Sequence, residues 1–238
     1  GYDNLLDEIE ENLGIAVHPM SWPINGGRDF KGVYLIPNQS LNLFESNKTK
    51  KADDIVRVEG VNDPLLAQKV GEKNAQKLQE DIELVDGVYG ELNLQSYLDA
   101  DVAPVFFGSA LNNFGIQELL DTFVDIAPNP LPRKTQVRDV APTEEKFTGF
   151  IFKIHANLDP RHRDRIAFLR VCSGKFLRNK AYKHTRIDKS FKFANPYTFL
   201  ADSKEIADAA FPGDVVGLYD TGNFKIGDTL TEGEVLQF

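Results

Sequence analysis

Residues 102–124 read VAPVFFGSALNNFGIQELLDTFV, and this stretch indicates the fold class of the first part of the chain. The first six residues are apolar and predict a buried strand, with Pro104 near its start. A glycine-containing turn follows, and apolar residues then recur at helical spacing from Ile116 to Val124, which predicts an amphipathic helix. A strand, a tight turn and a helix in this order are typical of α/β domains. On these residues alone, the turn is better interpreted as an ordinary connection than as a ligand site.

The residues before this stretch continue the α/β pattern. An apolar stripe predicts a helix over residues 3–13, which Gly14 ends. Helical spacing recurs from Pro64 to Val85, and the Asp-Gly pair at residues 86–87 predicts the end of that helix. Runs typical of strands lie between these helices at residues 16–18, 30–36 and 41–44, and a charged connection follows at residues 48–54.

The pattern changes after residues 128–132, where three prolines cannot continue a helix and predict a stiff connection. Beyond them, short runs of strand-forming residues are separated by glycines, at residues 150–154, 166–171, 215–218 and 228–230. Many short strands of this kind predict a small closed β-barrel. We therefore expect an α/β part over residues 1–142 and an all-β closed barrel over residues 143–238.

The composition is that of an ordinary globular protein, with 42% hydrophobic and 26% charged residues. No apolar run approaches the ~20 residues that cross a bilayer, and the chain does not start with a signal-peptide pattern. We therefore predict a cytoplasmic protein without a membrane segment. Cys172 is the only cysteine and the four histidines stand far apart, so the sequence predicts neither an internal disulfide nor a metal site.

Charge is distributed unevenly along the chain, whose net charge is −9. Residues 1–142 contain 12 basic and 23 acidic residues, a net of −11, whereas residues 143–238 contain 15 and 13, a net of +2. Residues 161–192 alone contain eleven basic residues against two acidic ones. A basic surface suits contacts with RNA phosphates, and the alternative interpretation is the solvated outer face of a barrel.

The basic segment contains the candidate residues for contact with RNA and the ribosome. These are Arg161, His162, Arg163 and Arg165. The acidic residues Asp159 and Asp164 could instead pair with these arginines in a purely structural network. The aromatic residues interleaved with the basic ones are expected to fill the barrel, and they are Phe168, Phe176, Tyr182 and Phe191.

Several motifs resemble the bacterial peptide-chain release factor 3 family of translational GTPases, and together they cover essentially the whole chain. PVFFGSAL at residues 104–111 resembles the last nucleotide-binding motif of these GTPases. HPMSWPI at residues 18–24 and FKGVY at residues 30–34 are similar to an insertion shared with elongation factor G, and Trp22 favours release factor 3. Four further motifs resemble the second domain of the family, and they are KFTGFIFKI at 146–154, DPRHRDRIAF at 159–168, PGDVVGL at 212–218 and IGDT at 226–229.

The resemblance implies part of a ribosome-associated GTPase of translation termination. The family binds GTP or GDP with Mg²⁺ and promotes the departure of codon-reading release factors, and its second domain leans on the small ribosomal subunit and its RNA. The first part of the chain would be the C-terminal part of a P-loop-type GTPase domain with an insertion. In the last nucleotide-binding motif, the backbone of Ser109 and Ala110 would contact the guanine base, with Leu111 packing beside them.

The phosphate-binding and hydrolysis motifs of such GTPases are absent from this sequence. We therefore predict that the chain alone has no catalytic residue, binds no nucleotide and is inactive, whereas the longer parent is a GTPase. One alternative is a fragment of another translational GTPase, of the elongation factor G or ribosome-protection type, against which Trp22 and residues 161–165 argue. A second alternative is a non-enzymatic RNA-binding module, against which the strand–turn–helix at residues 102–124 argues.

Overall fold

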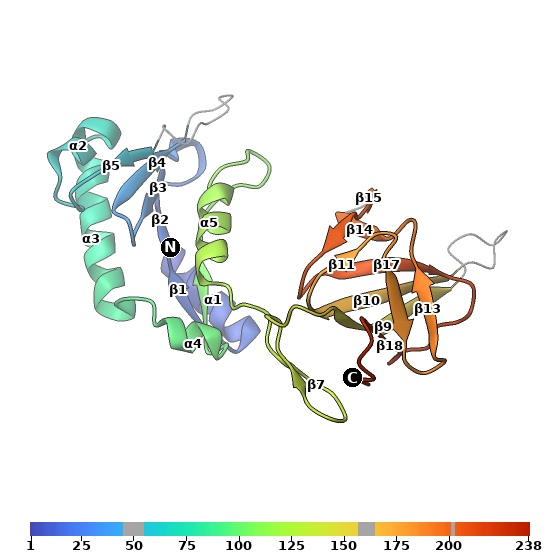
Figure 1. Cartoon of the computed structure of the whole chain (residues 1–238). Helices are drawn as coiled ribbons and strands as arrows, with labels where there is room; N and C mark the ends of the chain where they lie inside the picture. The colour runs from blue at the N-terminus through green and yellow to red at the C-terminus, as the bar shows by residue number, and fades with distance from the viewer. Residues whose placement is uncertain (45–54, 157–164, 201–202) are drawn as a thin grey trace. The chain divides into compact units, whose positions relative to one another are not determined.

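The computed structural model describes residues 1–44, 55–156, 165–200 and 203–238. These residues form two compact units, Gly1–Pro128 and Asn129–Phe238, which are described separately below (Figure 1). None of the helices within the described ranges is both long enough and apolar enough to cross a membrane.

The first unit contains five α-helices, one short 3-10 helix and six strands in its described part. In chain order these are α1 (Tyr2–Leu13), β1 (Ala16–Pro19), β2 (Ser21–Ile24), η1 (Gly27–Asp29), β3 (Gly32–Leu35), β4 (Ser40–Leu43), β5 (Ile55–Arg57), α2 (Pro64–Val70), α3 (Glu72–Tyr89), α4 (Leu94–Leu98), β6 (Val102–Val105) and α5 (Ile116–Ile126). Strands β1 and β6 pair in parallel, and β2, β3, β4 and β5 form an antiparallel sheet in that order. Helices α3 and α5 lie on opposite sides of the strands (Figure 1).

Helix α3 supplies one wall of the core of the first unit. Its residues Leu78, Ile82 and Val85 follow helical spacing, and all three are buried. They pack in one cluster with residues of α1, β1, β2 and β4, which include Leu6, Val17, Trp22 and Leu41.

The helix predicted from Pro64 to the Asp-Gly pair is two helices. Helix α2 ends at Gly71, whose positive φ of 88° is unfavourable for other residues, and α3 then runs through Gly87 to Tyr89. The predicted end at residues 86–87 was therefore wrong. A glycine inside a helix costs about 1 kcal/mol relative to alanine, and the buried stripe of α3 outweighs that cost.

The second unit consists of β-strands. They are β7 (Arg133–Lys134), β8 (Asp139–Val140), β9 (Thr148–Ala156), β10 (Arg165–Ser173), β11 (Phe176–Leu177), β12 (Ala181–His184), β13 (Lys189–Lys192), β14 (Tyr197–Leu200), β15 (Ser203–Ile206), β16 (Ala209–Ala210), β17 (Val215–Asp220) and β18 (Thr229–Thr231). Eight of them form a sheet with the order β13-β12-β18-β9-β10-β17-β14-β15. The core lies on one face of this curled sheet and contains Phe147, Leu169, Phe176, Tyr182 and Leu230.

The closed barrel predicted from the sequence is not found in the described residues, and the domain is barrel-like instead. The sheet ends at β13 on one side and at β15 on the other, and these two strands do not pair with each other. The β14–β15 hairpin is joined to the rest of the sheet through a single residue pair, Tyr197 with Gly217. A separate two-stranded pair, β11 with β16, places Phe176 and Ala210 against the core. These short strands cover the core without continuing the ladder that closure requires.

The hairpin of β7 and β8 belongs to the second unit. Val140 is fully buried, and the N–H of Gln136 donates to the carbonyl of Gln237 at 3.0 Å. The guanidinium of Arg138 binds the carboxylates of Glu144 at 2.8 Å and Glu234 at 2.7 Å. The compact unit therefore begins at residue 129, and the division into functional domains at residues 1–142 and 143–238 stays a prediction.

Candidate functional site

The turn after β6 contains two of the predicted nucleotide-binding residues in a closed hydrogen-bond pattern. The N–H of Ser109 donates to the carbonyl of Phe114 at 2.8 Å, and the N–H of Phe114 donates back to Ser109 at 2.9 Å. The carbonyl of Ala110 accepts from the N–H of Asn113 at 3.1 Å. The N–H of Ser109, which the sequence suggested as a guanine contact, is therefore already used inside the turn.

Leu111 completes the predicted set, and its side chain is 97% exposed. The structure thus brings Ser109, Ala110 and Leu111 together in one turn before α5, but Leu111 is not packed beside the other two. Their contact with a guanine base stays a prediction.

Phe114 anchors this turn, and sequence reasoning did not single it out. Its ring is 4% exposed and lies edge-on to Phe30 at 5.6 Å and to Phe44 at 5.4 Å, between ring centroids. Gly108 is required beside it, because a Cβ there would lie 2.6 Å from the carbonyl oxygen of Phe114. Phe30 and Phe44 flank the hairpin of β3 and β4. Two aromatic residues at the outer ends of neighbouring predicted strands are the sequence feature from which this cluster could have been predicted.

Helix α5 carries an apolar face that the described part of the first unit does not cover. None of its residues is buried, and Leu119, Leu120, Phe123 and Val124 are between 40% and 77% exposed. Glu118 ties the helix to β4, since its carboxylate accepts from the side-chain amide of Asn42 at 2.5 Å. An amphipathic helix normally buries its apolar stripe, so this face is suited to contact with a further structural element.

Trp22, on which the choice of family depended, lies in the core of the first unit. It is 2% exposed, its indole N–H donates to Asp81 at 3.2 Å, and its ring lies edge-on to Tyr2 and Phe107. These contacts assign Trp22 a packing role and no direct contact with a ligand.

Three of the four predicted RNA-binding residues, Arg161, His162 and Arg163, lie outside the described residues. The fourth, Arg165, begins β10 and is engaged in the fold. Its guanidinium donates to the carboxylate of Asp220 at 2.7 Å and to the carbonyl of Phe224 at 3.1 Å. Asp220 is 2% exposed. Arg165 therefore fixes the end of the segment that carries the other three.

Asp220 is held by the turn that follows it. One carboxylate oxygen accepts the N–H of Gly222 at 2.9 Å and that of Asn223 at 2.7 Å, while the other accepts Arg165. An aspartate that bonds the backbone two and three residues ahead stabilises such a turn. The ion pair thus links β10 to the connection between β17 and β18.

The aromatic residues of the basic segment divide between the two faces of the sheet. Phe176 and Tyr182 are fully buried in the core, and Phe191 packs against it, as expected. The expectation for Phe168 was wrong, because its ring contacts Phe152, His155 and Phe199 outside the core. Alternation along β10 directs residues 167, 169 and 171 inward, which leaves position 168 on the outer face.

The most strongly coupled polar cluster joins His184, Arg186 and Asp228. Nε2 of His184 lies 2.8 Å from the carboxylate of Asp228, and Arg186 binds the same carboxylate at 2.6 Å and 2.8 Å. Burial raises the pKa of Asp228, but the hydrogen bonds from Arg186 and the N–H of Lys225, together with His184, outweigh it and hold the pKa below its usual value. His184 is fully buried, so the cluster stabilises the fold and offers no acid or base to a substrate.

A pocket of about 290 Å³ lies beside the β7–β8 hairpin, and four of its charged lining residues take part in ion pairs, namely Arg138, Glu144, Glu232 and Glu234. Arg138 binds Glu144 and Glu234, and Lys180 binds Glu232. The N–H of Phe147 donates to the carboxylate of Glu232 at 2.5 Å. These pairs assign a structural role to the residues that form them.

Neither a metal site nor a reactive thiol is found in the described part of the chain. No group of three or more potential side-chain ligands of a metal ion is present there. Cys172 is 4% exposed, and burial raises the pKa of its thiol to about 11. Such a thiol is a poor nucleophile because little thiolate is present at neutral pH.

Comparison with known proteins identifies the second unit. Residues 146–233, which span β9 to β18, match the family model described as Elongation factor G domain 2. The second unit has the elongation factor G domain 2 fold. The match covers 88 of the 238 residues of the chain.

A solved structure resembles the chain more broadly. The crystal structure of ttk003000868 from Thermus thermophilus aligns over 98% of this chain with a TM-score of 0.61 and 18% sequence identity. At this identity the likeness shows the fold alone. The alignment covers 34% of that chain, so the present chain spans about a third of the length of its structural relative.

Proposed function

We propose that this chain is part of a ribosome-associated GTPase of translation termination, of the release factor 3 type. The observation that carries the proposal is the match of residues 146–233 to domain 2 of elongation factor G, a translational GTPase. In the parent protein, GTP and GDP would bind with Mg²⁺, and GTP hydrolysis would be linked to the departure of codon-reading release factors. A ribosomal role places the protein in the cytoplasm.

The first unit would be the C-terminal part of the GTPase domain, with strands β2 to β5 as an inserted subdomain. Two features of the unit support this assignment. In the described part of the unit, strands β1 and β6 form a parallel sheet of two strands, whereas parallel sheets are normally larger and covered on both faces. Helix α5 follows β6 and keeps its apolar face uncovered. Further parallel strands beside β1 and β6 would cover that face.

The nucleotide contact would come from the turn of Ser109 and Ala110. The N–H of Ala110 takes part in none of the backbone hydrogen bonds of the described turn, whereas that of Ser109 binds Phe114. Ala110 is therefore the better donor to a guanine oxygen, and Leu111 would pack only when further residues of the domain are present. The phosphate-binding groups would all come from elsewhere in the parent.

The ribosome contact would come from the basic residues before β10. Arg161, His162 and Arg163 are proposed to contact small-subunit ribosomal RNA. Arg165 acts as a positioning residue, because its ion pair with Asp220 fixes where the segment joins the sheet.

A second candidate is a translational GTPase of the elongation factor G or ribosome-protection type. The family model that matches residues 146–233 is that of elongation factor G itself, and this observation favours it. The two candidates share a GTPase domain and the second domain, and they differ in what the parent does on the ribosome.

The experiment uses the parent protein with ribosomes that carry a fluorescent codon-reading release factor after peptide release. Factor dissociation is followed with GTP, with GDP and without nucleotide. Faster dissociation with GTP supports the release factor 3 assignment. Faster movement of transfer RNA and messenger RNA with no effect on the release factor identifies the elongation factor G type. GTP hydrolysis that ribosomes do not stimulate contradicts both.

A further inference from the structure

The outer face of four neighbouring strands in the second unit, β9, β10, β17 and β14, carries a row of aromatic side chains. Residues that lie directly opposite each other on paired strands share a face of the sheet. Phe168 on β10 is opposite Gly217 on β17, and Gly217 is opposite Tyr197 on β14. Tyr219 is opposite Ile166, which is opposite His155 on β9. We call this surface the aromatic face, and it comprises Phe152, His155, Phe168, Tyr197, Phe199 and Tyr219.

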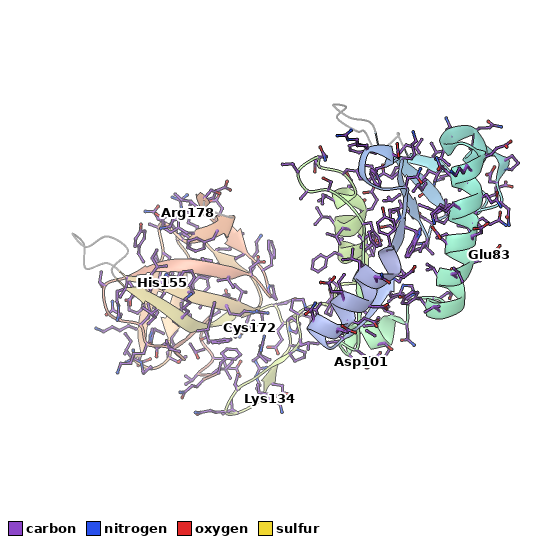
Figure 2. The ribbon with its side chains drawn as sticks, turned by 180° about the vertical axis from the view of Figure 1, so that it is seen from behind. Glu83, Asp101, Lys134, His155, Cys172 and Arg178 are labelled. Atoms are coloured by element: carbon purple, nitrogen blue, oxygen red, sulfur yellow. The ribbon has the colours of Figure 1, made fainter. Side chains whose placement is uncertain are left out.

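The rings of the aromatic face contact one another across the strands. The ring of Phe168 lies 5.3 Å from that of Phe199, 5.7 Å from that of His155 and 6.4 Å from that of Phe152, between centroids. Tyr197 and Tyr219 lie edge-on at 5.2 Å. His155, labelled in Figure 2, is at the end of the row on β9. The rings thus form two groups of contacts, one around Phe168 and one of Tyr197 with Tyr219, and the strand register sets both groups on the same face of the sheet.

Two features set the positions of these rings while they stay exposed. Gly217 leaves room for Phe199, because a Cβ at residue 217 would lie 2.8 Å from an atom of that ring. Phe152 lies at a register shift between β9 and β10, which sets its ring beside Phe168. Even so, Phe152 is 40%, Phe199 38% and Tyr219 50% exposed. The core of the unit lies on the opposite face of the sheet, so core packing does not account for these rings.

The charges on the aromatic face are positive. Nζ of Lys153 lies 5.8 Å from the ring centroid of Phe168, and Lys204 is opposite Phe199 on the β14–β15 hairpin. The described residues of these four strands and of β15 include two acidic residues. Asp220 is buried and paired with Arg165, and Glu205 is opposite Thr198 on the other side of the hairpin. Exposed rings beside lysines, with no exposed carboxylate on the same face among the described residues of these strands, fit a partner that is anionic and presents flat π-faces.

We propose that the aromatic face binds single-stranded RNA through stacking of its unpaired bases. Sheets that present aromatic rings to solvent bind single strands in this way, and nearby cations bind the phosphates. Exposed apolar side chains gathered on one face of a sheet mark a binding surface, and the lysines favour an anionic partner over an uncharged protein surface. The inference rests on the sheet itself. It uses residues of the strands and not the arginines before β10, and it does not depend on the parent being a release factor.

The test measures binding of the whole chain to a fluorescent oligouridylate of about ten nucleotides, within the site sizes of single-strand-binding domains. An abasic ribose-phosphate oligomer of equal length has the same charge without the bases. The variants Phe152→Leu and Phe199→Leu remove one ring each and keep an apolar side chain. Phe211→Leu is the matched control, because Phe211 is 53% exposed with Nζ of Lys175 at 5.2 Å from its ring but lies outside the aromatic face.

We expect the abasic oligomer to bind at least about fivefold more weakly than oligouridylate, and each aromatic-face variant to lose about fivefold or more for oligouridylate. The control variant should bind as the unchanged chain does. The slope of log affinity against log salt should stay the same in all three variants, since none removes a phosphate contact. Circular dichroism verifies folding, and Phe152→Leu keeps the test valid if Phe199→Leu unfolds.

Equal binding of the two oligomers would overturn the proposal, because charge alone would then explain the affinity. The same loss in Phe211→Leu would overturn it as well. Absence of oligonucleotide binding would overturn it and leave the aromatic face to a protein partner. Failure of the ribosome experiment above, by contrast, affects only the proposed function.

Discussion

The ion pair of Arg165 with Asp220 allows a direct test of whether Arg165 stabilises the second unit. The Asp220→Asn substitution keeps the size of the side chain and one of its oxygens. The remaining oxygen can still accept the N–H groups of Gly222 and Asn223, but an amide nitrogen then faces the guanidinium of Arg165. The substitution therefore removes one charge-assisted hydrogen bond and leaves the turn intact.

The expected loss is about 2 kcal/mol, because a hydrogen bond to a charged group contributes about 1.5–3 kcal/mol and Arg165 is partly exposed. The second unit has 110 residues, from 129 to 238. At about 2.1 cal/mol/K per residue, its unfolding entropy is roughly 0.23 kcal/mol/K. A loss of 2 kcal/mol then lowers the Tm of this unit by about 9 °C.

The assay follows thermal unfolding by circular dichroism and by tryptophan fluorescence. Trp22 is the only tryptophan and is buried in the first unit, so its fluorescence reports that unit alone. We expect Asp220→Asn to lower the circular-dichroism transition of the second unit and to leave the Trp22 transition unchanged. Asp208→Asn is the control, since Asp208 is 86% exposed in its pair with Arg178 and should change little. An Asp220→Asn protein as stable as the unchanged chain would refute the role given to this ion pair.

Three further predictions concern the unmodified chain and one variant. Because the folded-state pKa of Asp228 is lowered, its contribution to stability is present above the usual value of 3.8 and is lost as pH falls through the folded value. We therefore expect the free energy of unfolding, measured with urea between about pH 5 and pH 2, to depend less on pH in Asp228→Asn than in the unmodified chain. This range covers about three pH units in which carboxylates titrate. An equal pH dependence in the two proteins would contradict this. Cys172, with its thiol pKa of about 11, should not react with a disulfide reagent at pH 8 until the chain is unfolded, and rapid reaction of the native chain would contradict its burial. Titration calorimetry with GTP should show no saturable heat, because two neutral hydrogen bonds at about 0.5–1.5 kcal/mol each fall short of the ~4.1 kcal/mol of millimolar affinity; micromolar binding would show that a phosphate-binding segment was overlooked.

Local periodicity predicted much of the fold. The helix at residues 3–13, the helix from Ile116 and the long strands β9 and β10 are found where the sequence indicated them. Strand β2 was not among the predicted strands, and it contains Pro23, a residue that normally disfavours a strand. Pro23 is tolerated there since β2 is the edge strand of its sheet, where a missing N–H leaves no ladder bond unmade.

The candidate site was less predictable because its contacts join distant parts of the chain. Arg165 meets Asp220 across 55 positions, and no local pattern distinguishes an arginine that pairs in this way from one that faces RNA. Phe168 was placed in the core from its residue type, whereas the register of β10 directs it outward. The closed barrel also depended on pairing between the sheet edges, which strand-forming residues alone do not determine.

The proposed function is tested most directly by the rate at which a labelled codon-reading release factor leaves the ribosome when the parent protein and GTP are added. The account predicts faster departure with the parent than without it, and no acceleration by the present chain, whose sequence lacks the phosphate-binding motifs. A parent that leaves the departure rate unchanged, under conditions in which it hydrolyses GTP on ribosomes, would contradict the release factor 3 assignment.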